Sequence, residues 1–136
     1  MHVLVPVDDS DPSWAALALA CETYPDARIT ALHVLEPIHG EPAMWLSEDQ
    51  REAAAAEETG ELFAEVNATA SEYGVTVETE SVYGTPARTI VNYTEEEDVD
   101  HVFVGSHGRT GVSRVLLGSV AEGVVRRSPV PVTVAR

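Results

Sequence analysis

The sequence contains no lysine, a single cysteine and no long apolar run, and each shortage excludes a class of protein. One cysteine, Cys21, cannot form an internal disulfide, and its alanine- and leucine-rich surroundings predict a small core residue rather than a nucleophile. No stretch approaches the roughly 18–20 apolar residues of a membrane span, and no charged-then-apolar leader opens the chain. We therefore expect one cytoplasmic domain over residues 1–136, without a membrane partner.

Basic residues are scarce, with eight arginines against 23 acids and a net charge of −15. Nucleic acids need a basic footprint, so this balance argues against them as partners. Self-repulsion of this size destabilises a compact chain unless salt screens it. The composition therefore favours a halophile protein adapted to a salt-rich cytoplasm, and the alternative is an acidic protein of an ordinary cytoplasm.

The charge is unevenly placed along the chain. Residues 1–104 hold three arginines and 22 acids, a net charge of −19, whereas residues 105–136 hold five arginines and only Glu122 as an acid, a net charge of +4. In a protein this acidic, a positive segment suggests an anionic ligand, although arginines near a C-terminus can also complement a helix dipole or pair with acids elsewhere.

Strand-like and helix-like segments alternate along the chain. Apolar runs predict strands, and Pro12, Ser47 and Pro86 are typical of helix starts. Alternation of this kind indicates an α/β fold, a parallel sheet with helices on both faces, whose ligands bind where the strand order reverses. The expected strands are 2–7, 29–35, 75–82, 101–104 and 130–135, and the expected helices are 12–24, 47–73, 85–95 and 119–127.

A glycine-rich stretch, Gly105-x2-Gly108-x9-Gly118-Ser119, joins the fourth expected strand to the last helix. Glycines let a backbone approach a ligand closely, and a helix N-terminus offers free N–H groups, so the stretch is typical of a phosphate site. The absence of lysine excludes a Walker loop, and the dinucleotide spacing Gly-x-Gly-x-x-Gly does not occur. The simpler interpretation is a turn shaped by Gly105 and Gly108, followed by a capping box formed by Ser119 and Glu122.

This glycine spacing resembles the ATP-binding signature of the universal stress protein family, and the flanking segments 3–8, 31–34 and 128–134 are similar to that family's first, second and last strands. The resemblance implies a single doubly wound α/β domain. Its five-stranded parallel sheet would have the order 3-2-1-4-5, with four helices on both faces. The order then reverses between the first and fourth strands, where Asp8 and Gly105 follow.

The resemblance also implies the residues of an ATP site. Asp8 would bind the ribose, Val34 and Val104 would line the adenine slot, and the glycine motif would surround the phosphates. Asp8 could instead serve a turn or a helix cap, and the two valines could be plain core. The full set comprises Pro6, Asp8, Val34, Val104, Gly105, His107, Gly108, Arg109, Gly118, Ser119 and Val120.

Two loop residues of this set have open roles. Arg109 could contact phosphate or form a salt bridge at the rim, and His107 is more typical of a loop donor than of a catalyst. The histidines do not have metal-ligand spacing, so Mg²⁺ would come only with the nucleotide. Met44, Trp45 and Leu46 form an apolar loop that could be a lid, a partner contact or a segment packed on the domain.

The resemblance implies an ATP-binding stress-response module with little turnover, which pairs into a homodimer along the last strand, 130–135. A slow ATP hydrolase or phosphotransferase is the alternative, and the missing lysine and the lack of an identifiable base argue against it. An interaction module without a nucleotide is the third hypothesis, and the intact Gly108-to-Ser119 spacing argues against that one.

We predict that the folded protein is more stable in 1 M KCl than in 10 mM KCl, because the Debye length falls from ~30 Å to ~3 Å and screens the net charge of −15. The melting temperature should rise by about 4 °C or more, which corresponds to about 1 kcal/mol for a chain of this size. Scanning calorimetry in the two buffers measures the shift in melting temperature, and equal melting temperatures would contradict the halophile interpretation.

Overall fold

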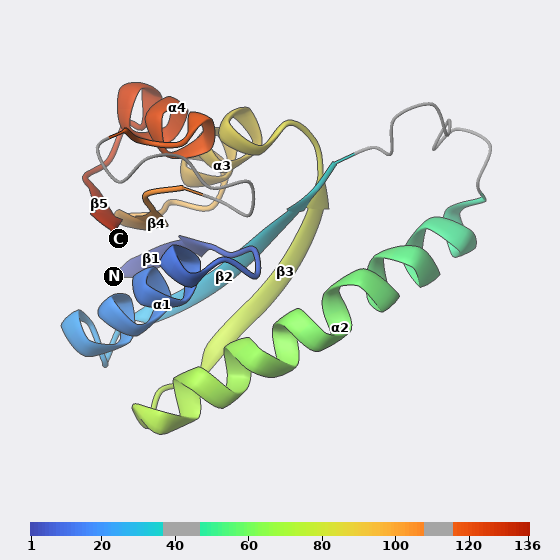
Figure 1. Cartoon of the computed structure of the whole chain (residues 1–136), viewed down its shortest axis with the longest axis horizontal. Coiled ribbons are helices and arrows are strands. Elements are labelled where there is room, and N and C mark those ends of the chain that lie inside the picture. The colour runs from blue at the N-terminus through green and yellow to red at the C-terminus, as the bar shows by residue number, and fades with distance from the viewer. Residues whose placement is uncertain (37–46, 108–115) are drawn as a thin grey trace.

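The computed structural model describes residues 1–36, 47–107 and 116–136. The predictions for Gly108, Arg109 and the Met44–Leu46 loop lie outside these residues. The described chain forms a five-stranded parallel sheet of order β3-β2-β1-β4-β5, which confirms the predicted α/β architecture (Figure 1). The strands are β1 His2–Pro6, β2 Arg28–Leu35, β3 Val77–Tyr83, β4 His101–Gly105 and β5 Val132–Ala135.

Two strands begin later than the sequence predicts. β3 begins at Val77 rather than Val75, because the Val75 N–H donates to Ala70 O at 3.0 Å and so belongs to the turn that ends the preceding helix. β5 begins at Val132 rather than Val130, because Val130 is held in a turn by the Ser128 hydroxyl. Prolines, which lack an N–H donor, lie on both sides of Val130.

Four helices cover the two faces of the sheet, as predicted (Figure 1). Side chains alternate along a strand, so Val3 and Val5 of β1 join the core cluster that includes residues of α1 and α2, whereas Leu4 joins the cluster of α3 and α4. Cys21 is buried in the first cluster, and burial raises the pKa of its thiol, which confirms a core role. The helices are α1 Asp11–Thr23, α2 Glu48–Glu72, α3 Pro86–Glu96 and α4 Ser119–Arg127.

One of the two predicted capping boxes forms. At α2, Gln50 N–H donates to Ser47 Oγ at 3.1 Å, and Ser47 N–H donates to Gln50 Oε1 at 2.9 Å. At α4 the predicted Ser119 cap is wrong, since Gly118 is the N-cap and Ser119 is the first helical residue. The Gly118 N–H donates to Ser106 O at 2.7 Å, and this bond joins the helix start to the segment after β4.

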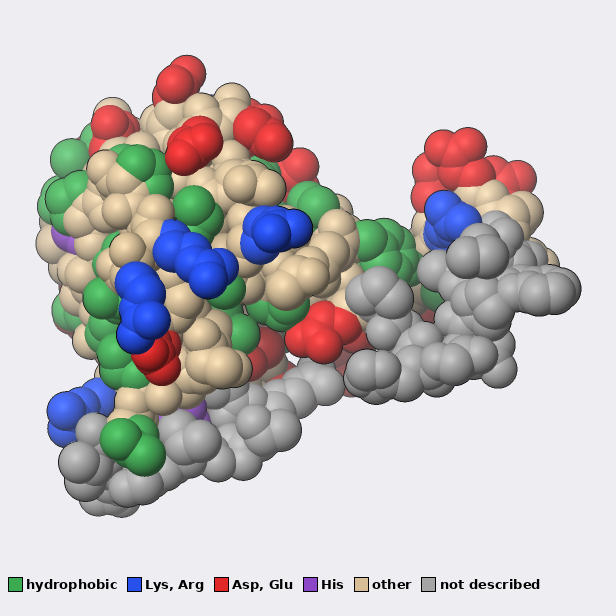
Figure 2. Space-filling model, turned by 90° about the horizontal axis from the view of Figure 1, so that it is seen from above, with side chains coloured by type: hydrophobic (Ala, Val, Ile, Leu, Met, Phe, Trp, Pro, Cys, Tyr) green, Lys and Arg blue, Asp and Glu red, His purple; other side chains and the backbone are tan. Residues whose placement is uncertain are grey.

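The positive C-terminal segment contributes to one surface of the fold. Arg126 and Arg127 of α4 are exposed, as is Arg88 of α3. Figure 2, which views the side of the molecule that carries α3 and α4, shows arginine side chains gathered there. Arg126 pairs with Glu122 one turn earlier, at 2.5 Å. Among the described residues, no helix is long and apolar enough to cross a membrane.

We predict that Gly105→Ala destabilises the fold by about 1–3 kcal/mol, because overpacking costs this much in a filled core. A Cβ at Gly105 would lie 2.8 Å from Pro12 C and Ser13 N, which are backbone atoms of α1. The matched control is Gly60→Ala in α2, where an added Cβ meets no atom within 4 Å. That change should stabilise by ~0.5–1 kcal/mol through helix propensity. Urea titration measures both, and similar effects of the two variants would refute the tight contact.

Candidate functional site

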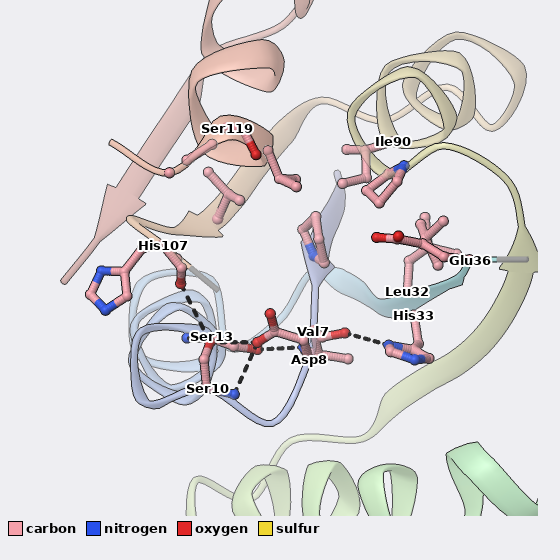
Figure 3. Close-up of a pocket in the computed structure, with 18 of the residues that line it drawn as sticks. Val7, Asp8, Ser10, Ser13, Leu32, His33, Glu36, Ile90, His107 and Ser119 are labelled. Atoms are coloured by element: carbon pink, nitrogen blue, oxygen red, sulfur yellow. Dashed lines mark hydrogen bonds between the residues drawn. The ribbon is translucent and has the colours of Figure 1, made fainter. Parts of the chain in front are cut away.

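A cavity of about 580 Å³ opens at the carboxyl edge of the sheet, where the strand order reverses between β1 and β4 (Figure 3). The segments that follow these two strands, the β2 end, and the first turns of α3 and α4 contribute to its wall. This is the position at which open parallel sheets bind ligands. The walls combine apolar side chains with nearly as many polar ones, so the cavity can contact both an apolar and a polar part of a small molecule.

Nine of the eleven residues predicted for the nucleotide site line this one cavity. They come from segments up to 114 positions apart in the sequence, and the two others, Gly108 and Arg109, lie outside the described residues. The nine are Pro6, Asp8, Val34, Val104, Gly105, His107, Gly118, Ser119 and Val120.

Asp8 follows β1 and fixes the turn into α1. Its Oδ1 accepts hydrogen bonds from the Ser10 N–H, at 3.0 Å, and from the Ser10 hydroxyl, while its own N–H donates to Ser13 Oγ at 2.9 Å (Figure 3). Ser10 in turn caps α1. Asp8 therefore has the turn role that was one of the two interpretations of the sequence. Since both side-chain bonds use Oδ1, this role does not occupy the second carboxylate oxygen.

The N-terminus of α4 forms one end of the cavity. Gly118, Ser119 and Val120 line it, and the first-turn N–H groups of a helix have no partner within the helix. The Ser119 hydroxyl makes no capping bond, and Ser119 is exposed. A Cβ on Gly118 would lie 3.0 Å from His107 Cα, so this glycine permits close contact between the helix start and the end of β4. The arrangement can receive an anion.

His107 contributes to the cavity through its backbone. Its carbonyl accepts a 3.5 Å bond from the Ser10 hydroxyl, and Figure 3 shows the imidazole pointing away from the cavity. The ring Nδ1 lies 3.2 Å from the hydroxyl of the buried Ser106, whose N–H donates to Ala135 O at 2.6 Å. These contacts anchor the loop and place no imidazole nitrogen at the cavity.

The universal stress protein family model matches residues 1–136. The chain belongs to this family. Among relatives, the universal stress protein MJ0531 of Methanocaldococcus jannaschii is 36% identical over 98% of this chain and 81% of its own length.

Solved universal stress proteins have the same fold. UspA from Lactobacillus plantarum superposes with a TM-score of 0.84 at 28% identity, covering 100% of this chain and 97% of the other. A universal stress protein solved in complex with cAMP superposes with a TM-score of 0.77 at 25% identity, again covering 100% and 97%. The strand order implied by the family resemblance is thus the order that the chain adopts.

Sequence reasoning missed three ionisable residues of this universal stress protein's cavity: His33, Glu36 and Glu58. His33 is buried, its Nδ1 lies 2.8 Å from Val7 O, and its Nε2 lies 3.8 Å from Glu58 Oε1. Glu36 directly follows β2, so the rule that ligands bind at carboxyl strand ends could have found it. Glu58 lies within α2, where no local pattern marks it.

The chemistry that the described residues support is binding of an anionic, partly apolar molecule. The cavity combines helix N–H groups and a serine hydroxyl with apolar walls and carboxylates. Within residues 1–36, 47–107 and 116–136, no group of three or more His, Cys, Asp or Glu is arranged to hold a metal ion.

Proposed function

We propose that this chain binds ATP, accompanied by Mg²⁺, and acts as a dimeric stress-response module with little or no turnover. One observation carries the proposal. The carboxylate and the glycine–serine segment expected to hold ribose and phosphate, Asp8 and Gly118-Ser119, border one cavity at the reversal of strand order. The structural relative in complex with cAMP supports an adenine nucleotide as the class of ligand.

The proposed orientation follows from charge. Phosphates would lie at the α4 N-terminus, where helix N–H groups and the Ser119 hydroxyl donate. The ribose would lie near the unengaged oxygen of Asp8, since a carboxylate can accept bonds from hydroxyls. The base would lie among the apolar residues Leu32, Val34 and Ile90.

Slow turnover is proposed because the described part of the cavity offers little help to an attacking water. The chain has no lysine to bind the γ-phosphate. The Asp8 carboxylate is held in a turn by Ser10, and the His107 imidazole points away from the cavity (Figure 3). A base must lie within hydrogen-bond reach of the proton that it takes, and the Asp8 oxygen that the turn leaves unengaged is the one proposed to bind the ribose.

We predict that calorimetry at molar salt detects binding of Mg-ATP, with hydrolysis far below ~1 per second. Ser119→Ala should weaken binding several-fold while changing stability by less than about 0.5 kcal/mol, because the Ser119 hydroxyl forms no cap. Asp8→Ala should weaken ATP and ADP to the same extent, since both carry the same ribose.

Ser71→Ala, an exposed position on α2, is the matched control and should leave affinity unchanged. A wild-type protein that binds no nucleotide would support the interaction-module hypothesis instead. Fast turnover that one substitution abolishes would support a hydrolase or phosphotransferase.

The dimer proposal has a geometric basis in β5, which is an edge strand. Val102 N–H donates to Pro131 O at 3.0 Å, and Ser106 N–H donates to Ala135 O at 2.6 Å, so odd-numbered residues of this segment bond to β4. Because bonding alternates along a strand, Val132 and Val134 direct their N–H and C=O groups outward. An uncovered edge of this kind can pair with a second copy across a two-fold axis.

We predict that Val134→Pro weakens the homodimer about tenfold or more, because proline removes an outward donor without removing a bond to β4. Val134→Thr, which keeps the N–H, is the control and should remain dimeric. Sedimentation velocity at molar salt and micromolar concentration measures the mass, and a wild-type monomer would refute the proposal.

A further inference from the structure

The two ends of the cavity differ in chemistry (Figure 3). Ser119 and the α4 N-terminus form one end, which donates hydrogen bonds. Figure 3 shows Glu36, His33, Leu32 and Ile90 on the other side of the cavity, away from Ser119. Phosphate oxygens and carboxylates repel each other, so a nucleotide with its phosphates at α4 directs its base toward Glu36.

The two carboxylates that line the base end accept hydrogen bonds and cannot donate them. The ionised carboxylates of Glu36 and Glu58 have only acceptor oxygens. His33 Nδ1 lies 2.8 Å from Val7 O, and since a carbonyl cannot donate, Nδ1 carries the proton. Nε2 lies 3.8 Å from Glu58 Oε1, so both ring nitrogens of His33 face oxygen atoms of the protein.

A carboxylate directed at the base favours a base that donates hydrogen bonds. Adenine carries an amino group at C6, with two N–H donors. Hypoxanthine carries a carbonyl oxygen there, whose lone pairs would face the lone pairs of a carboxylate. Its N1–H could donate to one carboxylate oxygen, but the second oxygen would then lie against O6, and the two partial negative charges would repel each other.

We propose that Glu36 determines the specificity of the cavity for purines with an amino group at C6, adenine over hypoxanthine. This inference rests on the proposed nucleotide binding. Glu36 is assigned rather than Glu58 because Figure 3 shows the Glu36 carboxylate directed into the cavity. Glu58 Oε1 instead lies 3.8 Å from His33 Nε2.

Calorimetric titration with three nucleotides tests the proposal. ATP carries an amino group at C6, ITP an oxygen and purine riboside triphosphate a hydrogen. We expect wild type to bind ATP about tenfold more tightly than either analogue, because both lack the amino group that donates to the carboxylate, and a hydrogen bond to a charged group is worth about that factor. In Glu36→Gln the preference over ITP should fall to within about threefold, because an amide can donate to O6 as well as accept.

Glu57→Gln is the matched control, since Glu57 is an exposed residue of α2 outside the cavity lining, and it should keep the wild-type preference. Glu36→Ala should lose the preference as Glu36→Gln does, and melting temperatures establish that each variant is folded.

Equal affinity of wild type for ATP and ITP would overturn the inference while leaving nucleotide binding intact. Loss of the preference only in Glu58→Gln would overturn the assignment to Glu36. A wild type that binds none of the three would overturn the proposed function itself.

Discussion

The contact between the end of β4 and the start of α1 is the constraint on which the cavity depends. Gly105 lies so close to Pro12 and Ser13 that a Cβ would come within 2.8 Å of their backbone atoms. This approach brings the Asp8–Ser10 turn against the segment after β4, where the Ser10 hydroxyl donates to His107 O. Two loops almost a hundred residues apart in sequence therefore form one wall, and their relative position is set by backbone contact.

The glycines of the motif serve the fold as well as any ligand. Gly105 allows β4 to meet α1, and Gly118 allows the start of α4 to meet His107. Their spacing is thus compatible with two interpretations, a turn and a phosphate site, and the structure contains the packing that the first requires. Substituting these glycines would disturb the fold and the cavity together. The side chains that report on binding alone are those without a packing role, such as the exposed Ser119.

Sequence patterns predicted the strands and the four helices because buried strands and capped helices have local signatures, whereas the order of the strands was implied only by the family resemblance. The Ser47 capping box formed, since both of its hydrogen bonds join residues of the same helix turn. The Ser119 box did not form although the helix has the predicted bounds, because Gly118, whose N–H donates to Ser106 O, is the N-cap. Similarly, β5 lost two predicted residues to a Ser128 turn. A local sequence pattern cannot predict such hydrogen bonds, because it does not show which acceptor groups the fold brings close to a given donor.

The candidate site was predictable to the extent that a family motif covers it. Asp8 and the glycine–serine segment carry that motif, whereas Glu36 and Glu58 come from elements with no motif and reach the cavity only through the fold. In a chain with 23 acids, two more glutamates carry no signal in the sequence.

The positions of Glu36 and Glu58 matter because both side chains are negatively charged. The end of the cavity opposite α4 is acidic, like most of the chain, while the N-terminus of α4 forms the other end. A dipolar ligand, anionic at one end and hydrogen-bond-donating at the other, matches that division. Strong acidity and nucleotide binding are therefore compatible in one small domain, provided that the acids face the base and the helix terminus faces the phosphates.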